Sequence, residues 1–170
     1  MKGSIVGLLL MLPLNINAAD CSNANIPAST DSANFTINGD GTVVDNNTQL
    51  MWMRCSIGQT WNATSSNCTG SPTFYQWDKA LLASNNYSFA GFSDWRLPNI
   101  NELRSIVEDC RSSPAVNREL FPNSPIGKFW SSSTYIANAA QAWLIDFDLG
   151  RDNFDLKTKT NALRLVRVKN

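Results

Sequence analysis

The sequence predicts one α+β domain, with short strands in its first and last thirds and two helices between them. Three observations support this prediction. Clusters of turn residues divide the outer parts of the chain into short apolar runs. Two segments in the middle carry apolar residues at helical spacing. Four cysteines follow an apolar N-terminal segment, so we expect the domain to be stabilised by disulfides.

The first twenty residues are typical of a secretory signal peptide. Lys2 precedes an apolar run from Ile5 to Leu14, and small residues follow at Ala18 and Ala19. This run is shorter than the ~20 residues that a membrane-spanning helix needs. We therefore expect residues 1–19 to be a signal peptide and residues 20–170 to form one domain that is secreted or periplasmic.

An even number of cysteines in an exported chain predicts disulfides, and four cysteines allow three connectivities. Cys55 and Cys68 flank a polar excursion rich in turn residues, so we expect these two to be joined, which stabilises the fold by ~3 kcal/mol in the chain-entropy model. Cys21 and Cys110 then pair by elimination. A zinc site is the rejected alternative, because the sequence has no C-x-x-C spacing and no histidine.

The amino-acid composition argues against several classes of function. The chain has 14 basic and 14 acidic residues, a balance that gives no indication of nucleic acid as a partner. The absence of histidine excludes Ser-His-Asp and Cys-His catalytic groups. Paired carboxylates remain an alternative for acid-base chemistry, as in glycoside hydrolysis, but the acidic residues are scattered and form no motif. We therefore identify no catalytic residue, cofactor site or metal site.

The first strands are predicted between residues 35 and 55, where apolar and polar residues alternate. Turns at Gly39–Gly41 and Asn46–Asn47 separate them. Asp40 and Asp45 lie at these turns, and turn chemistry explains both better than a calcium site does.

A first helix is predicted to be capped near Ser71 or Thr73, with Pro72 in its first turn. Its core-facing residues would be Phe74, Trp77, Ala80 and Leu81. Residues 87–95 read as a loop.

A second helix is predicted after Asn99, which can cap it, with Glu102 completing a capping box. An apolar stripe follows at Leu103, Ile106, Val107 and Cys110. We expect Trp52, Trp77, Trp95, Leu103 and Ile106 to be core residues. Arg96 should be held by a buried or half-buried partner, because an unpaired guanidinium between Trp95 and Leu97 is costly.

The last third is predicted to be β structure, with strands over residues 128–135, 142–150 and 161–168. The second of these would place Trp143, Ile145 and Phe147 on one face and Leu144, Asp146 and Asp148 on the other. Without a base to activate them, Ser131, Ser132 and Ser133 are interpreted as strand and turn hydroxyls.

Positive charge is concentrated near the end of the chain, at Arg151, Lys157, Lys159, Arg164 and Arg167. If these side chains converge, they form a site for the sulfate or carboxylate groups of a polyanionic glycan. The alternative is a solvated or structural role, because the odd spacing of Arg164 and Arg167 directs them to opposite faces of a strand.

The passages "GFSDWRLPNINELRSIVE", "FWSSSTY", "AWLIDFDLG" and "RLVR" occur in this order, and the chain resembles the Legionella collagen-like protein C-terminal domain family over residues 35–168. This resemblance implies a C-type-lectin-like fold, with two helices packed on twisted antiparallel strands. Name-giving members of the family are adhesins for sulfated polysaccharide. No collagen-like repeat occurs here, and the Glu-Pro-Asn and Trp-Asn-Asp signatures of calcium-dependent lectins are missing.

These observations favour an exported, non-catalytic binding module, such as an adhesin that recognises extracellular glycan or a surface protein. The alternatives are an extracytoplasmic enzyme that uses carboxylate chemistry on glycans and a structural component of an envelope assembly.

Overall fold

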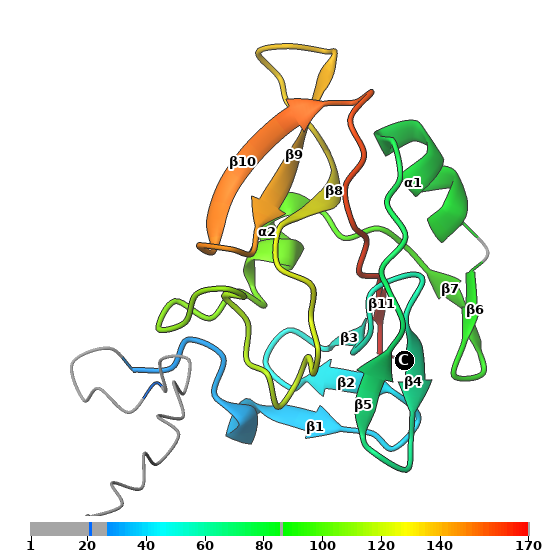
Figure 1. Ribbon diagram of the computed structural model, residues 1–170, viewed down its shortest axis with the longest axis vertical. Coiled ribbons are helices and arrows are strands. Elements are labelled where there is room, and N and C mark those ends of the chain that lie inside the picture. The colour runs from blue at the N-terminus through cyan, green and yellow to red at the C-terminus, as the bar shows by residue number, and fades with distance from the viewer. Residues whose placement is uncertain (1–20, 22–26, 86, 170) are drawn as a thin grey trace, which may run out of the picture.

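The computed structural model describes Cys21, residues 27–85 and residues 87–169, and its two larger sheets lie at opposite ends of the molecule, with α2 between them (Figure 1). It confirms an α+β domain with mostly antiparallel strands, two helices and two disulfides. The predicted signal peptide, residues 1–19, lies outside the described residues.

The first sheet joins the beginning of the described chain to its end. Its strands, in spatial order, are β1 (Phe35–Ile37), β2 (Thr42–Asp45), β3 (Leu50–Met53) and β11 (Val166–Val168), all antiparallel, and a short 3₁₀ helix, η1 (Ser32–Asn34), precedes β1. The predicted turns are confirmed. Asp40 accepts hydrogen bonds from the backbone N–H and hydroxyl of Thr42, and Asp45 accepts one from the N–H of Asn47. Both carboxylates thus stabilise the turns by hydrogen bonds.

The second sheet has the order β10-β9-β8, with β8 (Lys128–Thr134), β9 (Gln141–Asp146) and β10 (Arg151–Leu156). Because side chains alternate along a strand, Trp143 and Ile145 share one face of β9, as predicted, whereas Phe147 lies beyond its end. The sequence analysis missed β10, since an exposed edge strand with charged residues lacks a buried apolar pattern.

Two hairpins complete the β structure, namely β4 (Thr60–Asn62) with β5 (Asn67–Thr69), and β6 (Tyr87–Phe89) with β7 (Phe92–Trp95). The prediction of a loop over residues 87–95 is wrong. Ala90 and Gly91 both have positive φ, 51° and 80°, which is the geometry of a two-residue hairpin turn. Alanine rarely adopts this conformation, so the sequence gives little indication of the turn.

The helix α1 (Trp77–Ser84) begins later than predicted, with Gln76 as its N-cap residue. Residues before it are extended because Tyr75 exchanges two backbone hydrogen bonds of 3.0 Å with Asn161. Phe74 is consequently 54% exposed and does not face the core, whereas Ala80 is buried and Leu81 is half-buried.

The helix α2 (Ile100–Arg104) starts at the predicted capping box of Asn99 and Glu102 but has only five residues. The chain then continues in turns. Leu103, Ile106 and Val107 are nevertheless all buried, so the predicted apolar stripe is confirmed for these residues. Cys110 is half-buried.

Two clusters of buried side chains form the core. The first packs α2 and the 115–121 segment against the first sheet, and the second packs α1 and Trp95 against β3, β8 and β9. Trp52, Trp95, Leu103 and Ile106 are buried as predicted. Trp77 is only half-buried, because it packs at the edge of the second cluster, where its Nε1 donates to the carbonyl of Ser131.

The disulfide pairing agrees with the prediction. Cys55 is bonded to Cys68 and Cys21 to Cys110, with Cα–Cα distances of 5.5 and 5.4 Å. The first bond closes the base of the β4–β5 hairpin. The second attaches the N-terminal arm, defined here as Cys21 and residues 27–31, to the turns after α2.

Across the residues that the structure describes, no helix has the length and apolar character required to cross a bilayer.

Candidate functional site

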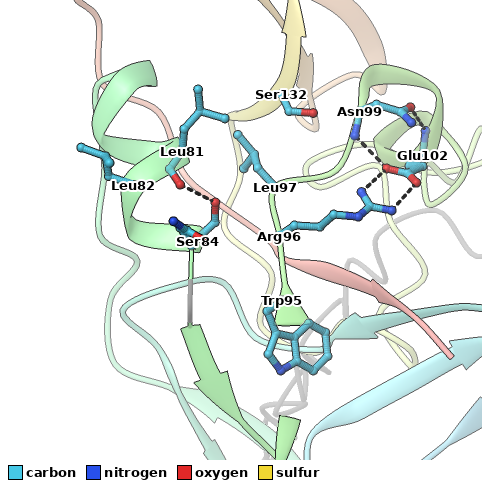
Figure 2. Close-up of a pocket in the computed structure, with 10 residues that line it drawn as sticks. Leu81, Leu82, Ser84, Trp95, Arg96, Leu97, Asn99, Glu102 and Ser132 are labelled. Carbon is cyan, nitrogen blue, oxygen red and sulfur yellow. Dashed lines mark hydrogen bonds and ion pairs between the residues drawn. The ribbon is translucent and has the colours of Figure 1, made fainter. Parts of the chain in front are cut away.

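An open groove of about 620 Å³ lies between the C-terminal half of α1 and the segment that leads from β7 into α2 (Figure 2). Leu81 and Leu82 of α1 form its apolar wall, and Leu82 is 64% exposed. Arg96, Asn99 and Glu102 form the opposite, polar wall. The groove therefore offers apolar contact on one side and hydrogen-bonding groups on the other.

The polar wall is held together by a bidentate ion pair. Nη1 and Nη2 of Arg96 each donate to one carboxylate oxygen of Glu102, at 2.7 Å in both cases. The same carboxylate accepts from the backbone N–H of Asn99 at 2.8 Å, and the side-chain oxygen of Asn99 accepts from the N–H of Glu102 at 2.9 Å. The prediction that Arg96 has a half-buried partner is confirmed, since the Glu102 side chain is only 17% exposed.

Both members of this pair are charged at neutral pH. Partial burial disfavours the charged carboxylate of Glu102, but hydrogen bonds from Arg96 and Asn99 outweigh it and lower the pKa of Glu102. The hydrogen bond to Glu102 raises the pKa of Arg96. A carboxylate held in this way is a poor general acid or base near pH 7, because its pKa is far from that pH.

The three serines of β8 are structural hydroxyls, as predicted. The hydroxyl of Ser131 donates to the carbonyl of Trp143 at 2.8 Å, and that of Ser132 donates to the carbonyl of Pro98 at 3.2 Å. The hydroxyl of Ser133 accepts from the N–H of Ile100, the first residue of α2. The contact of Ser131 lies within the second sheet, and those of Ser132 and Ser133 attach β8 to the start of α2.

Two of the predicted ligand-binding residues are buried. Arg164 donates to the carbonyls of Met53 and Arg54, and its guanidinium lies 4.6 Å from the ring centre of Phe121. Arg167 is held by the carboxylate of Asp94, with Nε 2.6 Å from one oxygen. Their burial supports the structural alternative and removes both from the surface.

The other three predicted residues are nearer the surface but do not converge. Lys157 donates to the carbonyl of Ala139 at 2.8 Å and lies 4.3 Å from the ring centre of Trp77. Arg151 and Lys159 are exposed. Arg151 begins β10 and Lys159 lies in the turn after its end, so the length of the strand, ~17 Å, lies between the two positions. The structure thus does not bring the five residues together.

Cys21, Glu108 and Cys110 are the one group of potential metal ligands found among the described residues. Both sulfur atoms belong to the disulfide, so they are not thiolate ligands. Glu108 instead accepts hydrogen bonds from the N-terminal arm, including one of 2.6 Å from the hydroxyl of Thr30.

Sequence reasoning missed an aromatic cluster on the second sheet. Tyr135, Trp143 and Phe154 lie in ring contact, although they are separated in the sequence. The alternation in β9 indicated that Trp143 lies on one face, but its neighbours depend on β10, which was not predicted.

Comparison with known proteins gives one finding. The model of the Lcl C-terminal domain matches residues 41–167. A search of curated proteins found no match. The matched region extends from the turn before β2 into β11, and it includes the groove, the capping box of α2, the second sheet and the first sheet except β1. The chain therefore belongs to the Lcl C-terminal domain family, as the order of its motifs predicted.

Proposed function

We propose that this chain is an exported binding module that recognises an extracellular glycan or a surface partner and does not convert it chemically. The observation that carries this proposal is the groove between α1 and α2. It combines an apolar wall with a polar wall, and its one carboxylate among the described lining residues is neutralised by Arg96.

The polar wall has the rigidity that recognition requires. The ion pair and the capping box fix the side chains of Arg96, Asn99 and Glu102 relative to α2, so a ligand does not have to order them. The Arg96 side chain is 43% exposed and can donate further hydrogen bonds into the groove. Ser132 adds a hydroxyl at the same site.

Export and a C-type-lectin-like fold are parts of the same proposal. Two disulfides favour an oxidising compartment, which agrees with a periplasmic or secreted location. Membership of the Lcl C-terminal domain family favours adhesion and a lectin-like arrangement of helices and strands.

The test is retention of the purified domain on an array of neutral and sulfated glycans, together with turnover assays on chromogenic glycosides. We expect retention without turnover. Leu82→Lys, which places a charge on the apolar wall, should weaken retention, whereas Leu149→Lys should not. Leu149 is a suitable control because it is 55% exposed and does not line the groove. Turnover of any glycoside, or equal retention of both variants, would contradict the proposal.

A further inference from the structure

Three aromatic side chains from different strands form a platform on the second sheet, defined here as Tyr135, Trp143 and Phe154. Tyr135 follows the end of β8, Trp143 lies in β9 and Phe154 lies in β10. The rings of Tyr135 and Phe154 are stacked, with centroids 4.3 Å apart and an interplanar angle of 10°. Trp143 meets both edge-on, at 5.0 and 5.9 Å.

The strand register places the platform on one face of the sheet. Phe154 lies opposite Trp143, and the next pair on this face is Leu156 opposite Gln141. Tyr135 donates its backbone N–H to the carbonyl of Gln141, which brings it to the same end of the sheet.

The platform is not part of the core. None of its three residues belongs to either buried cluster, and Phe154 is 39% exposed. Two further apolar residues near it are exposed: Leu156, on the same face of β10, is 42% exposed, and Ile136, which follows Tyr135 in the sequence, is 98% exposed. Cross-strand ring pairs stabilise a sheet by only about 1 kcal/mol. This stabilisation accounts for the contact between the rings, but it does not account for the exposure of Leu156 and Ile136.

The one ionisable side chain that β9 and β10 place on the platform face, Asp152, is already paired. Asp152, on the same face, accepts from Arg104 at 2.9 Å, and Lys157 donates to the carbonyl of Ala139. Asp155, on the opposite face, lies 3.6 Å from Lys128. Arg151 also lies on that opposite face, because it is an odd number of residues from Phe154. The described residues of these two strands therefore present no unpaired charge on the platform face, which favours an uncharged ligand.

The platform by itself is too small for a stable protein interface. An aromatic side chain has at most about 250 Å² of surface, and Phe154, the most exposed ring, is 39% exposed. The three rings together then expose at most about 300 Å², well below the ~800 Å² that each partner buries in a stable interface. One or two sugar rings match this area.

We propose that the platform binds the apolar face of uncharged pyranose units in a glycan. One face of a pyranose ring presents C–H groups, which pack against the electron-rich faces of aromatic rings. The Tyr135 hydroxyl and the Gln141 amide, neither of which has a side-chain hydrogen-bond partner among the described residues, can bond the sugar hydroxyls at the rim. This inference rests on the proposed function and specifies its ligand class.

The test is native gel electrophoresis through gels that contain hydroxyethylcellulose, galactomannan or dextran. The parent protein should be retarded by at least one of these neutral polysaccharides. Phe154→Ala and Tyr135→Ala should weaken that retardation on the order of tenfold. Phe154→Leu, which keeps apolar volume but removes the ring, should also weaken it. Phe74→Ala is the matched control, because Phe74 is 54% exposed and has no ring contact within the described part of the chain.

Each result of the electrophoresis either supports or overturns the inference that the platform binds neutral glycan. Absence of retardation for the parent in all three gels overturns the inference, and so does equal retardation of the Phe154 variants and the parent. A dimer that dissociates in Phe154→Ala on size-exclusion chromatography would show that the platform joins two copies instead. Retention on the glycan array that survives loss of the platform leaves the proposed function standing, so the two failures are distinguishable.

Discussion

At the scale of single residues, the most unusual group is the guanidinium of Arg164, which is buried among carbonyls rather than carboxylates. It donates to the carbonyls of Met53 and Arg54 and, at 2.8 Å, to the hydroxyl of Ser124. Burial lowers its pKa to about 9, so the side chain remains charged at neutral pH. It connects the end of β3 to the segment before β8.

Replacement of Arg164 by Met should lower the free energy of unfolding by about 3 kcal/mol, because two buried carbonyls lose their donor. Urea unfolding followed by tryptophan fluorescence measures the change. Arg151→Met is the control, since Arg151 is exposed, and it should change stability by less than about 0.5 kcal/mol. Equal stability of the two variants would show that Arg164 has no structural role.

Glu108 is a buried carboxylate that binds the N-terminal arm. It accepts hydrogen bonds from the backbone N–H groups of Ser29 and Thr30 and from both of their hydroxyls. Burial alone would raise its pKa, but these hydrogen bonds outweigh burial and lower it below the ordinary value of 4.5.

The arm should therefore be sensitive to acid. A carboxylate with a lowered pKa stabilises the folded state above its unfolded-state pKa, and this stabilisation is lost as the pH falls through the folded-state value. We expect Glu108→Gln to be less stable than the parent at pH 7 and to lose less further stability between pH 5 and pH 3. Thermal unfolding across this range measures both slopes, and parallel curves would contradict the role of Glu108.

At the scale of elements, α2 shows how a helix of five residues is maintained. So short a helix is unstable in isolation, because its nucleation is unfavourable. Here Asn99 caps one backbone N–H, Ser133 accepts from another, and Leu103 is buried in the first cluster. Its stability comes from its capping groups and its packing.

Asn99→Ala should accordingly destabilise the domain by about 1 kcal/mol, as loss of an N-cap side chain does. Asn99→Asp keeps the acceptor oxygen and should restore most of this loss. Asn101→Ala, an exposed change within the same helix, is the control and should be close to neutral. Chemical unfolding of the three variants measures the differences, and similar values for Asn99→Ala and Asn101→Ala would refute the capping role.

The elements that local signals define could be predicted, and those that depend on distant partners could not. The capping box and apolar stripe of α2 are encoded within a dozen residues. The start of α1 instead depends on Asn161, which holds Tyr75 in an extended conformation from far along the chain.

The same distinction applies to the candidate sites. The ion pair of Arg96 and Glu102 is local, and the cost of an unpaired guanidinium predicted a partner for Arg96, although not that this partner is Glu102. The platform is non-local, because Tyr135, Trp143 and Phe154 meet only through the register of three strands. The choice between an anion-binding and a structural role for the basic residues could not be made from the sequence for a related reason, since sequence gives their charge but not the burial of Arg164 and Arg167.

At the scale of the whole molecule, the two disulfides constrain very different lengths of chain. Cys55 and Cys68 are 13 residues apart, whereas Cys21 and Cys110 are 89 residues apart. In the chain-entropy model, closure of the longer loop removes more conformational entropy from the unfolded chain, by about 1.7 kcal/mol.

Removal of the Cys21–Cys110 bond by double substitution with Ala should therefore destabilise the domain by about 1.7 kcal/mol more than the same change at Cys55 and Cys68. Guanidinium unfolding of both double variants measures the difference. The opposite order would mean that the β4–β5 hairpin contributes more to the native state than its loop length implies.

The position of β11 in the first sheet determines how early, during synthesis of the chain, this sheet can be completed. Val166 pairs with Trp52 on one side and exchanges backbone hydrogen bonds with Arg96 on the other. Strand β3 is thus synthesised long before the partner that covers its edge, and the buried residues Leu163 and Leu165 of the second cluster arrive equally late. Until residues 163–168 have been made, β3 and the second cluster lack these partners, so we expect the first sheet to close only after β11 has emerged.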